Sequence, residues 1–121
     1  MTKASLKKLW ERDKGQCWHC GTDDDTVVPH HRANRGHGGS KVADRASNVI
    51  LMCSMHNGLM ESDVNVFREA KEFGWKISRH SVPYNEPIMR FDGRWFILGD
   101  MWQIWEVENE HRSDDGGPEP F

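Results

Sequence analysis

The first apolar positions of the chain recur at helical spacing. Leu6, Leu9 and Trp10 lie at i, i+3 and i+4, after Ser5, which can cap a helix, and before Gly15, which can end one. The pattern predicts a short N-terminal helix that packs on the core.

Two short apolar runs further along the chain are typical of paired strands. The β-branched run at 26–28 leads into Pro29-His30-His31-Arg32, and a second apolar run covers 48–52. The segment between them, 33–47, is rich in Gly, Asn, Arg and Ser, and loops of this length in small domains are usually functional. We therefore predict two antiparallel strands joined by a long basic loop.

Helical spacing returns after the second strand. A helix from Ser54 would carry Asn57 in its first turns and Glu61 further on. A second helix, capped by Ser62 or Asp63 and ended by Gly74, would turn three apolar residues inward, Val64, Phe67 and Ala70. An extended segment, 75–77, follows it.

The C-terminal third contains a hairpin signal and then loses its apolar pattern. Two apolar runs within 88–98 flank Asp92-Gly93, which predicts a β-hairpin. We expect three tryptophans to cover the core, Trp95, Trp102 and Trp105. From Glu106 the chain is acidic and rich in Gly and Pro, which predicts a disordered tail. The chain is thus expected to be one α+β domain, 1–105, with a tail, 106–121.

Cysteine usage indicates a metal rather than disulfides. With three cysteines no complete disulfide framework can form, and no signal-peptide pattern occurs near either end. The sequence also lacks an apolar run of about 18 residues, the length that spans a membrane. We therefore expect a soluble, cytoplasmic protein without membrane contact, whose thiols stay reduced.

The formal charge of −3 is unevenly distributed. Residues 1–80 carry thirteen Lys and Arg against ten Asp and Glu, whereas residues 81–121 carry three against nine. The basic surplus belongs to the part that holds the cysteines, so the overall negative charge does not exclude a nucleic-acid partner.

Two pairs of metal-type residues share one spacing. Cys17 and Cys20 are separated by two residues, and so are Cys53 and His56. Together the four complete a tetrahedral Cys₃His set, which predicts one structural zinc ion. A redox pair or two buried cysteines would explain the first pair but not the second. His19, between the first two ligands, is expected to be exposed at the tip of the turn.

These residues resemble the HNH, or ββα-metal, endonuclease family. The resemblance rests on the Cys-x-x-Cys pair, His30-His31 closing a first strand, the loop Arg35-Gly36-His37-Gly38-Gly39-Ser40, Asn48 opening a second strand, and the Cys-x-x-ligand pair entering a helix. With Gly58 and Glu61 added, the pattern is similar to the small free-standing HNH proteins of tailed bacteriophages. It implies a zinc-stapled ββα-metal core, 15–62, with an N-terminal helix, a second helix and a C-terminal hairpin.

The resemblance also implies an activity, a metal-dependent DNA endonuclease that hydrolyses or nicks phosphodiester bonds. By position, His31 would be the general base, Asn48 would support it through its amide or backbone, and His30 with Asn57 would hold one catalytic divalent ion. An amide ligand favours Mg or Mn over softer ions. In a phage setting the partners would be DNA and terminase or other packaging proteins, in the host cytoplasm.

The surroundings of the predicted site add two expectations. Four basic residues flank it and are expected to contact DNA phosphates, Arg32, Arg35, Lys41 and Arg45. Adjacent residues of a strand face opposite sides, so His30 and His31 can share one site only where the strand ends or twists.

Two positions depart from the common family pattern. His56 stands where many members have Cys, and Asn57 stands where they have a metal-binding His. In one alternative the register differs, so that His56 is the catalytic ligand and zinc is held otherwise. A second alternative is a zinc-bound DNA-binding module without catalysis. A third is a zinc-stabilised protein adaptor that uses the Trp-rich hairpin and the acidic tail.

Overall fold

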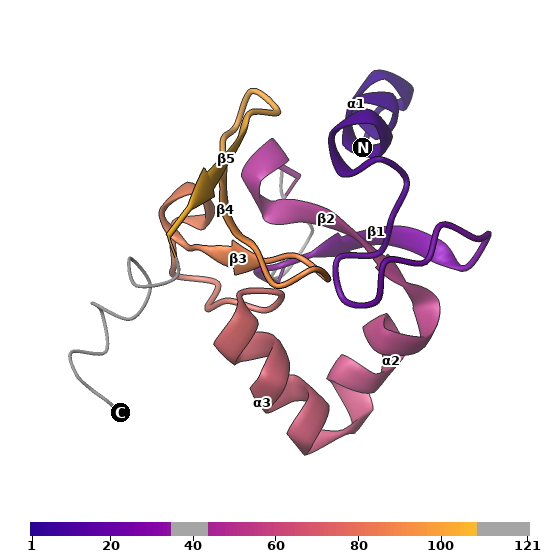
Figure 1. Cartoon of the computed structure of the whole chain (residues 1–121), viewed down its shortest axis with the longest axis vertical. Coiled ribbons are helices and arrows are strands. Elements are labelled where there is room, and N and C mark those ends of the chain that lie inside the picture. The colour runs from indigo at the N-terminus through magenta and orange to yellow at the C-terminus, as the bar shows by residue number, and fades with distance from the viewer. Residues whose placement is uncertain (35–43, 109–121) are drawn as a thin grey trace.

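The computed structural model describes residues 1–34 and 44–108, which form a small α+β fold (Figure 1). The described helices are α1 (Lys3–Asp13), α2 (Ser54–Ser62) and α3 (Val64–Phe73), with two 3-10 turns, η1 (Ala46–Asn48) and η2 (Pro83–Asn85). The described strands form two antiparallel sheets, one of β1 (Val27–His31) and β2 (Val49–Cys53), the other of β3 (Ile88–Met89), β4 (Trp95–Leu98) and β5 (Ile104–Val107). The predicted α+β class is confirmed.

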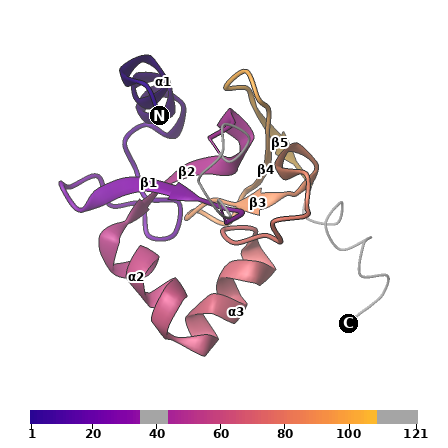
Figure 2. The ribbon, with the colours of Figure 1, turned by 180° about the vertical axis from the view of Figure 1, so that it is seen from behind.

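The β1–β2 pair lies at the centre of the molecule. Val27 stands opposite Cys53 and His31 stands opposite Val49, so the strands run antiparallel as predicted. All of β2 is buried, as its unbroken apolar sequence indicates. α1 lies on one side of the pair, and α2 and α3 lie on the other (Figures 1 and 2). β2 continues directly into α2 at Ser54, which fixes the strand end relative to the first turn of the helix.

The ends of α1 follow ordinary capping chemistry. The helix begins at Lys3 because the hydroxyl of Thr2, rather than that of Ser5 as predicted, accepts the N–H of Ser5 at 3.0 Å. It ends where Lys14 takes a left-handed conformation. Leu9 is fully buried, whereas Trp10 is exposed.

α3 has the predicted ends but a different buried face. The Asp63 carboxylate accepts the N–H groups of Asn65 and Val66, and Gly74 ends the helix at φ +83°, where a side chain would collide with the Pro87 carbonyl. Ala70 is buried as expected, but Val64 is 66% exposed and Phe67 is 42% exposed. The inward face is instead formed by Val66, Ala70 and Phe73, which recur at i, i+4 and i+7.

The C-terminal hairpin is confirmed and gains a third strand. β5 pairs with β4, placing Glu106 opposite Phe96, so regular structure extends to Val107 rather than stopping before 106. Trp95 is buried and Trp102 packs against the core, but Trp105 is 51% exposed on the outer strand. The predicted tail from 109 onward lies outside the described residues. The segment 75–77, predicted to be extended, contains a bend at its first two residues.

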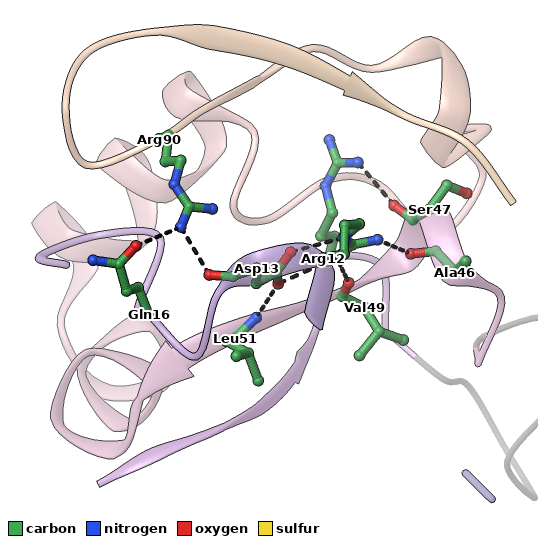
Figure 3. Close-up of polar contacts among 9 residues, drawn as sticks. Arg12, Asp13, Gln16, Ala46, Ser47, Val49, Leu51 and Arg90 are labelled. Atoms are coloured by element: carbon green, nitrogen blue, oxygen red, sulfur yellow. Dashed lines mark hydrogen bonds and ion pairs between the residues drawn. The ribbon is translucent and has the colours of Figure 1, made fainter. Parts of the chain in front are cut away.

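A buried polar network joins α1 to the strands (Figure 3). The Asp13 carboxylate pairs with Arg12 at 2.7 Å and accepts the N–H of Leu51 at 3.0 Å. The guanidinium of Arg12 also donates to the carbonyls of Ala46 and Val49 at 2.8 and 2.6 Å. Arg90, from the β3–β4 turn, donates to the Asp13 carbonyl at 2.8 Å. The network fixes the start of β2 against the end of α1, which Arg90 in turn holds.

Candidate metal centre and histidine site

The predicted zinc ligands come together at the junction of β2 and α2. The sulfur atoms of Cys17, Cys20 and Cys53 all lie within 4.8 Å of one another, with Cys20 Sγ 4.0 Å from Cys53 Sγ. His56 Nδ1 lies 3.1 Å from Cys53 Sγ. Ligands of a tetrahedral zinc ion lie about 3.3–3.8 Å apart. The donor set and its spacing therefore fit a metal ion such as zinc.

The turn that carries the first two cysteines is held by backbone contacts. The N–H of Gly21 donates to the Cys17 carbonyl at 2.9 Å, and the N–H of His19 donates to Cys17 Sγ at 3.3 Å. Gly21 has φ +79°, and a Cβ there would lie 2.9 Å from the ring of Phe91. The N–H of Trp18 donates to the Leu51 carbonyl at 3.0 Å, which attaches the turn to β2.

His19 lies beside the cluster rather than at an exposed tip, so that prediction was wrong. Its ring stacks on His56 with centroids 3.4 Å apart, and its Nε2 lies 3.6 Å from a Glu69 carboxylate oxygen on α3. Its Nδ1 is buried and has no hydrogen-bond partner among the described residues. His19, Cys20 and His56 form a second close group that overlaps the three sulfur atoms. Two imidazoles therefore stand near the fourth position of the cluster.

We expect His56 to be the fourth ligand. The His56→Ala variant should bind zinc more than about 100-fold more weakly, whereas His19→Ala should lose only about 10–100-fold, the effect of removing a neighbour of a ligand. The reason is that His56 Nδ1 directly contacts Cys53 Sγ, while His19 Nε2 is directed to Glu69. Competition with a chromophoric zinc chelator measures both values. The opposite ranking would make His19 the ligand.

His30, on β1, and Asn57, in the first turns of α2, lie side by side. His30 Nδ1 is 3.0 Å from Asn57 Oδ1, and His30 Nε2 is 2.8 Å from the Trp75 carbonyl. Burial is the largest influence on His30 and lowers its pKa to about 4, so the ring is neutral near pH 7. His56, which the alternative register would place here, instead contacts Cys53.

The tautomer of His30 determines what this pair can do. A carbonyl oxygen can only accept, so Nε2 carries the ring proton and Nδ1 offers a lone pair. With the amide oriented as described, Asn57 presents a second lone pair 3.0 Å away. Two such oxygen and nitrogen donors can share a cation, whereas an amide turned by 180° would make an ordinary N–H···N hydrogen bond. The geometry thus fits a two-ligand cation site with one harder donor.

His31 closes β1 and contacts a different part of the chain. Its Nε2 lies 2.7 Å from an Asp44 carboxylate oxygen. Asn48 is buried and contacts the chain just beyond His31: its Oδ1 accepts the N–H of Ala33 at 2.8 Å, and its own carbonyl accepts the N–H of Arg32 at 2.8 Å. Asn48 therefore fixes the backbone after His31, while the partner of the His31 ring is Asp44, which the sequence did not indicate.

Arg32 is a structural residue, which contradicts its predicted contact with DNA. Its side chain is fully buried, and the guanidinium donates to four backbone carbonyls at 2.8–3.2 Å, those of Ser47, Gly74, Pro83 and Glu86. Burial lowers its pKa to about 9, which still leaves it charged at neutral pH. Four carbonyls from three segments already accept the hydrogen bonds of the guanidinium, so it needs no phosphate as a partner.

Of the other three residues predicted to contact phosphates, the structure describes only Arg45. Arg45 is ion-paired with Asp100 at 2.5 Å and lies over the ring of Tyr84, so its charge already has a protein partner. Arg35 and Lys41 lie outside the described residues. Lys76, which the sequence did not indicate, places its ammonium 3.0 Å from both Glu61 and Asn34. It lines a pocket of about 370 Å³ together with residues of α2 and α3.

Arg32→Ala should destabilise the fold rather than selectively weaken DNA binding. Four buried carbonyls would lose their donor, and a cost of about 3–5 kcal/mol in free energy of unfolding is expected. Urea unfolding measures this cost, with the exposed Arg79→Ala as a control that should change little. An Arg32→Ala protein with parental stability but weaker DNA binding would restore the phosphate-contact role.

Comparisons with known proteins identify no relative of this chain, so its function must be inferred from the site. A scan against models of protein families, a search of curated proteins and a search of solved structures each find no match to this chain. Among the described helices, none is long and apolar enough to cross a membrane.

Proposed function

We propose that this chain is a metal-dependent DNA endonuclease of the HNH, or ββα-metal, type. The observation that carries the proposal is the 3.0 Å approach of His30 Nδ1 and Asn57 Oδ1, brought together by an antiparallel strand pair and the helix that follows it. The Cys/His cluster at the same junction supports it, since a structural zinc there would hold α2 against β2.

The residues of the chain divide the work of phosphodiester hydrolysis. His30, neutral because it is buried, and Asn57, from the first turns of α2, would bind one divalent cation, Mg or Mn by the hardness of the amide oxygen. That cation would neutralise charge on the scissile phosphate and on the departing oxygen. The Trp75 carbonyl holds the His30 ring in the tautomer that leaves the lone pair on Nδ1, the atom that faces Asn57. His31 would take the proton of the attacking water.

The substrate class follows from charge and from the resemblance. The basic surplus of residues 1–80 favours a polyanion, and Lys76, whose ammonium pairs with Glu61 of α2, is near enough to act electrostatically on His30. A setting in phage genome processing or packaging, with a terminase as partner in the host cytoplasm, belongs to the same proposal and derives from the sequence resemblance.

A metal panel tests the proposal. Zinc-loaded protein is incubated with supercoiled plasmid in Mg, Mn, Ni or no added divalent ion, and relaxed and linear products are separated on a gel. We expect cleavage that requires a divalent ion, its loss in Asn57→Ala, and a shift toward Ni in Asn57→His, because imidazole is the softer ligand.

A non-catalytic, zinc-bound DNA-binding module is the second candidate. Both ring nitrogens of His30 already have partners, Asn57 and the Trp75 carbonyl. If the Asn57 amide is turned by 180°, the same contacts are ordinary hydrogen bonds that serve only the fold, and this reading favours the second candidate. Folded, zinc-loaded protein that binds DNA but cleaves it with none of the metals would establish this candidate and remove the first.

A further inference from the structure

His31, which follows His30 at the end of β1, makes a separate contact with Asp44. Asp44 Oδ1 lies 2.7 Å from His31 Nε2, and the two side chains are 29% and 23% exposed. The other carboxylate oxygen of Asp44 lies 3.5 Å from the Met1 amino group. Asp44 is not one of the residues on which the resemblance to the HNH family rests, and no sequence motif indicated a role for it.

The pair is held by the structure on both sides. Asp44 precedes η1, where Arg45 pairs with Asp100 and the N–H and hydroxyl of Ser47 also donate to Asp100. His31 ends β1, and the backbone directly after it is bound by Asn48 at the end of η1. Asp44 and His31 are therefore carried by two segments that are joined to each other a few residues away.

The chemistry of the contact fixes the proton on the ring. The hydrogen bond from His31 is the largest cause that lowers the pKa of Asp44 below its ordinary value, so the carboxylate is ionised near pH 7 and can only accept. The ring must then donate from Nε2. In a neutral histidine the other nitrogen, Nδ1, carries the lone pair.

We infer that Asp44 is a positioning residue that holds His31 with its proton on Nε2, so that Nδ1 is the atom that accepts the proton of the attacking water. The inference rests on the proposed function. As the water oxygen bonds to phosphorus, its proton moves to Nδ1, and the P–O bond to the leaving 3′ oxygen breaks with its electron pair staying on that oxygen. The leaving oxygen takes a proton from solvent, and His31 returns its own to solvent, with Asp44 stabilising the transient imidazolium.

Two readouts test the inference on the zinc-loaded full chain. Long-range ¹H–¹⁵N correlation spectra report which ring nitrogen of His31 is protonated, with the signals assigned by their loss in His31→Gln. Steady-state cleavage of a DNA duplex gives kcat and KM separately. The variants are Asp44→Ala, Asp44→Glu as the conservative rescue, and Asp92→Asn as a control, an exposed carboxylate that pairs with Arg94 outside the site.

We expect Asp44→Ala to convert His31 to a mixture of tautomers and to lower kcat by about tenfold to 100-fold at nearly unchanged KM, less than the loss of about 10²–10⁴-fold for removing a general base, because His31 itself is kept. Asp44→Glu should recover the Nε2–H tautomer and part of kcat, and Asp92→Asn should change neither. An unchanged tautomer in Asp44→Ala overturns the inference, and so does a change confined to KM, which would assign Asp44 to DNA binding. Parental protein that cuts no DNA removes the proposed function instead, while the spectra still decide the tautomer.

Discussion

Loss of the metal from the Cys/His cluster is expected to unfold the chain. Structural zinc sites bind with an apparent free energy of about 10–16 kcal/mol, whereas domains of this size are stable by only about 5–15 kcal/mol in total. The cluster joins the turn before β1 to the end of β2 and the start of α2, and among the described residues the bond from Trp18 to Leu51 adds only a single backbone hydrogen bond between that turn and β2. Cys17→Ser should therefore lose zinc and cooperative thermal unfolding together.

Metal analysis and circular dichroism check this result. Parental protein should hold one zinc per chain and should lose its thermal transition when a strong chelator is added. Ser54→Ala, a change at an exposed position next to Cys53, serves as the control and should keep both metal and transition. A parental protein that melts at the same temperature with and without chelator would show that the cluster is not a structural metal site.

His31→Ala is expected to abolish DNA cleavage while the fold and the zinc content stay intact. Removing a general base lowers rates by about 10²–10⁴-fold. The ring contributes little to packing, because it is part-exposed and its hydrogen bond goes to the surface carboxylate of Asp44. The effect should therefore be confined to the rate of the chemical step.

Plasmid nicking under the optimal metal measures the loss, alongside zinc content and thermal unfolding. His80→Ala is the matched control, an exposed histidine in a turn, and should cut at the parental rate. A His31→Ala protein that cuts equally fast would show that His31 is not the general base and that another group activates the water.

Local patterns carried most of what the sequence could predict. The strands, the helix from Ser54, the carboxylate cap at Asp63 and the glycine stop at Gly74 depend on neighbours within a few positions, and all four are present. The same holds for the close group of Cys17, Cys20 and Cys53, with His56 beside Cys53, since two short spacings and one strand pairing bring these side chains together. The sequence did not predict which face of α3 is buried: Val66 packs inward, where Val64 was expected.

Contacts between distant segments explain what the sequence could not predict. Arg32 follows a histidine pair and carries the charge of a DNA contact, but its partners are carbonyls as far away as Glu86. Asp44 reaches His31 across thirteen positions, and Lys76 reaches Asn34 across forty-two. The spacing of these residues along the sequence does not predict any of these contacts. Each depends on how η1, η2 and the end of α3 fold back on β1.

His56 and Asn57 are consecutive residues of α2, yet one belongs to the sulfur cluster and the other to the His30 pair. Neighbours on a helix point about 100° apart, so a single turn serves both sites at once. We therefore expect that oxidation of two of these cysteines to a disulfide would also disturb the placement of Asn57. If the proposed function holds, such oxidation should lower DNA cleavage without modifying either histidine of the His30-His31 pair.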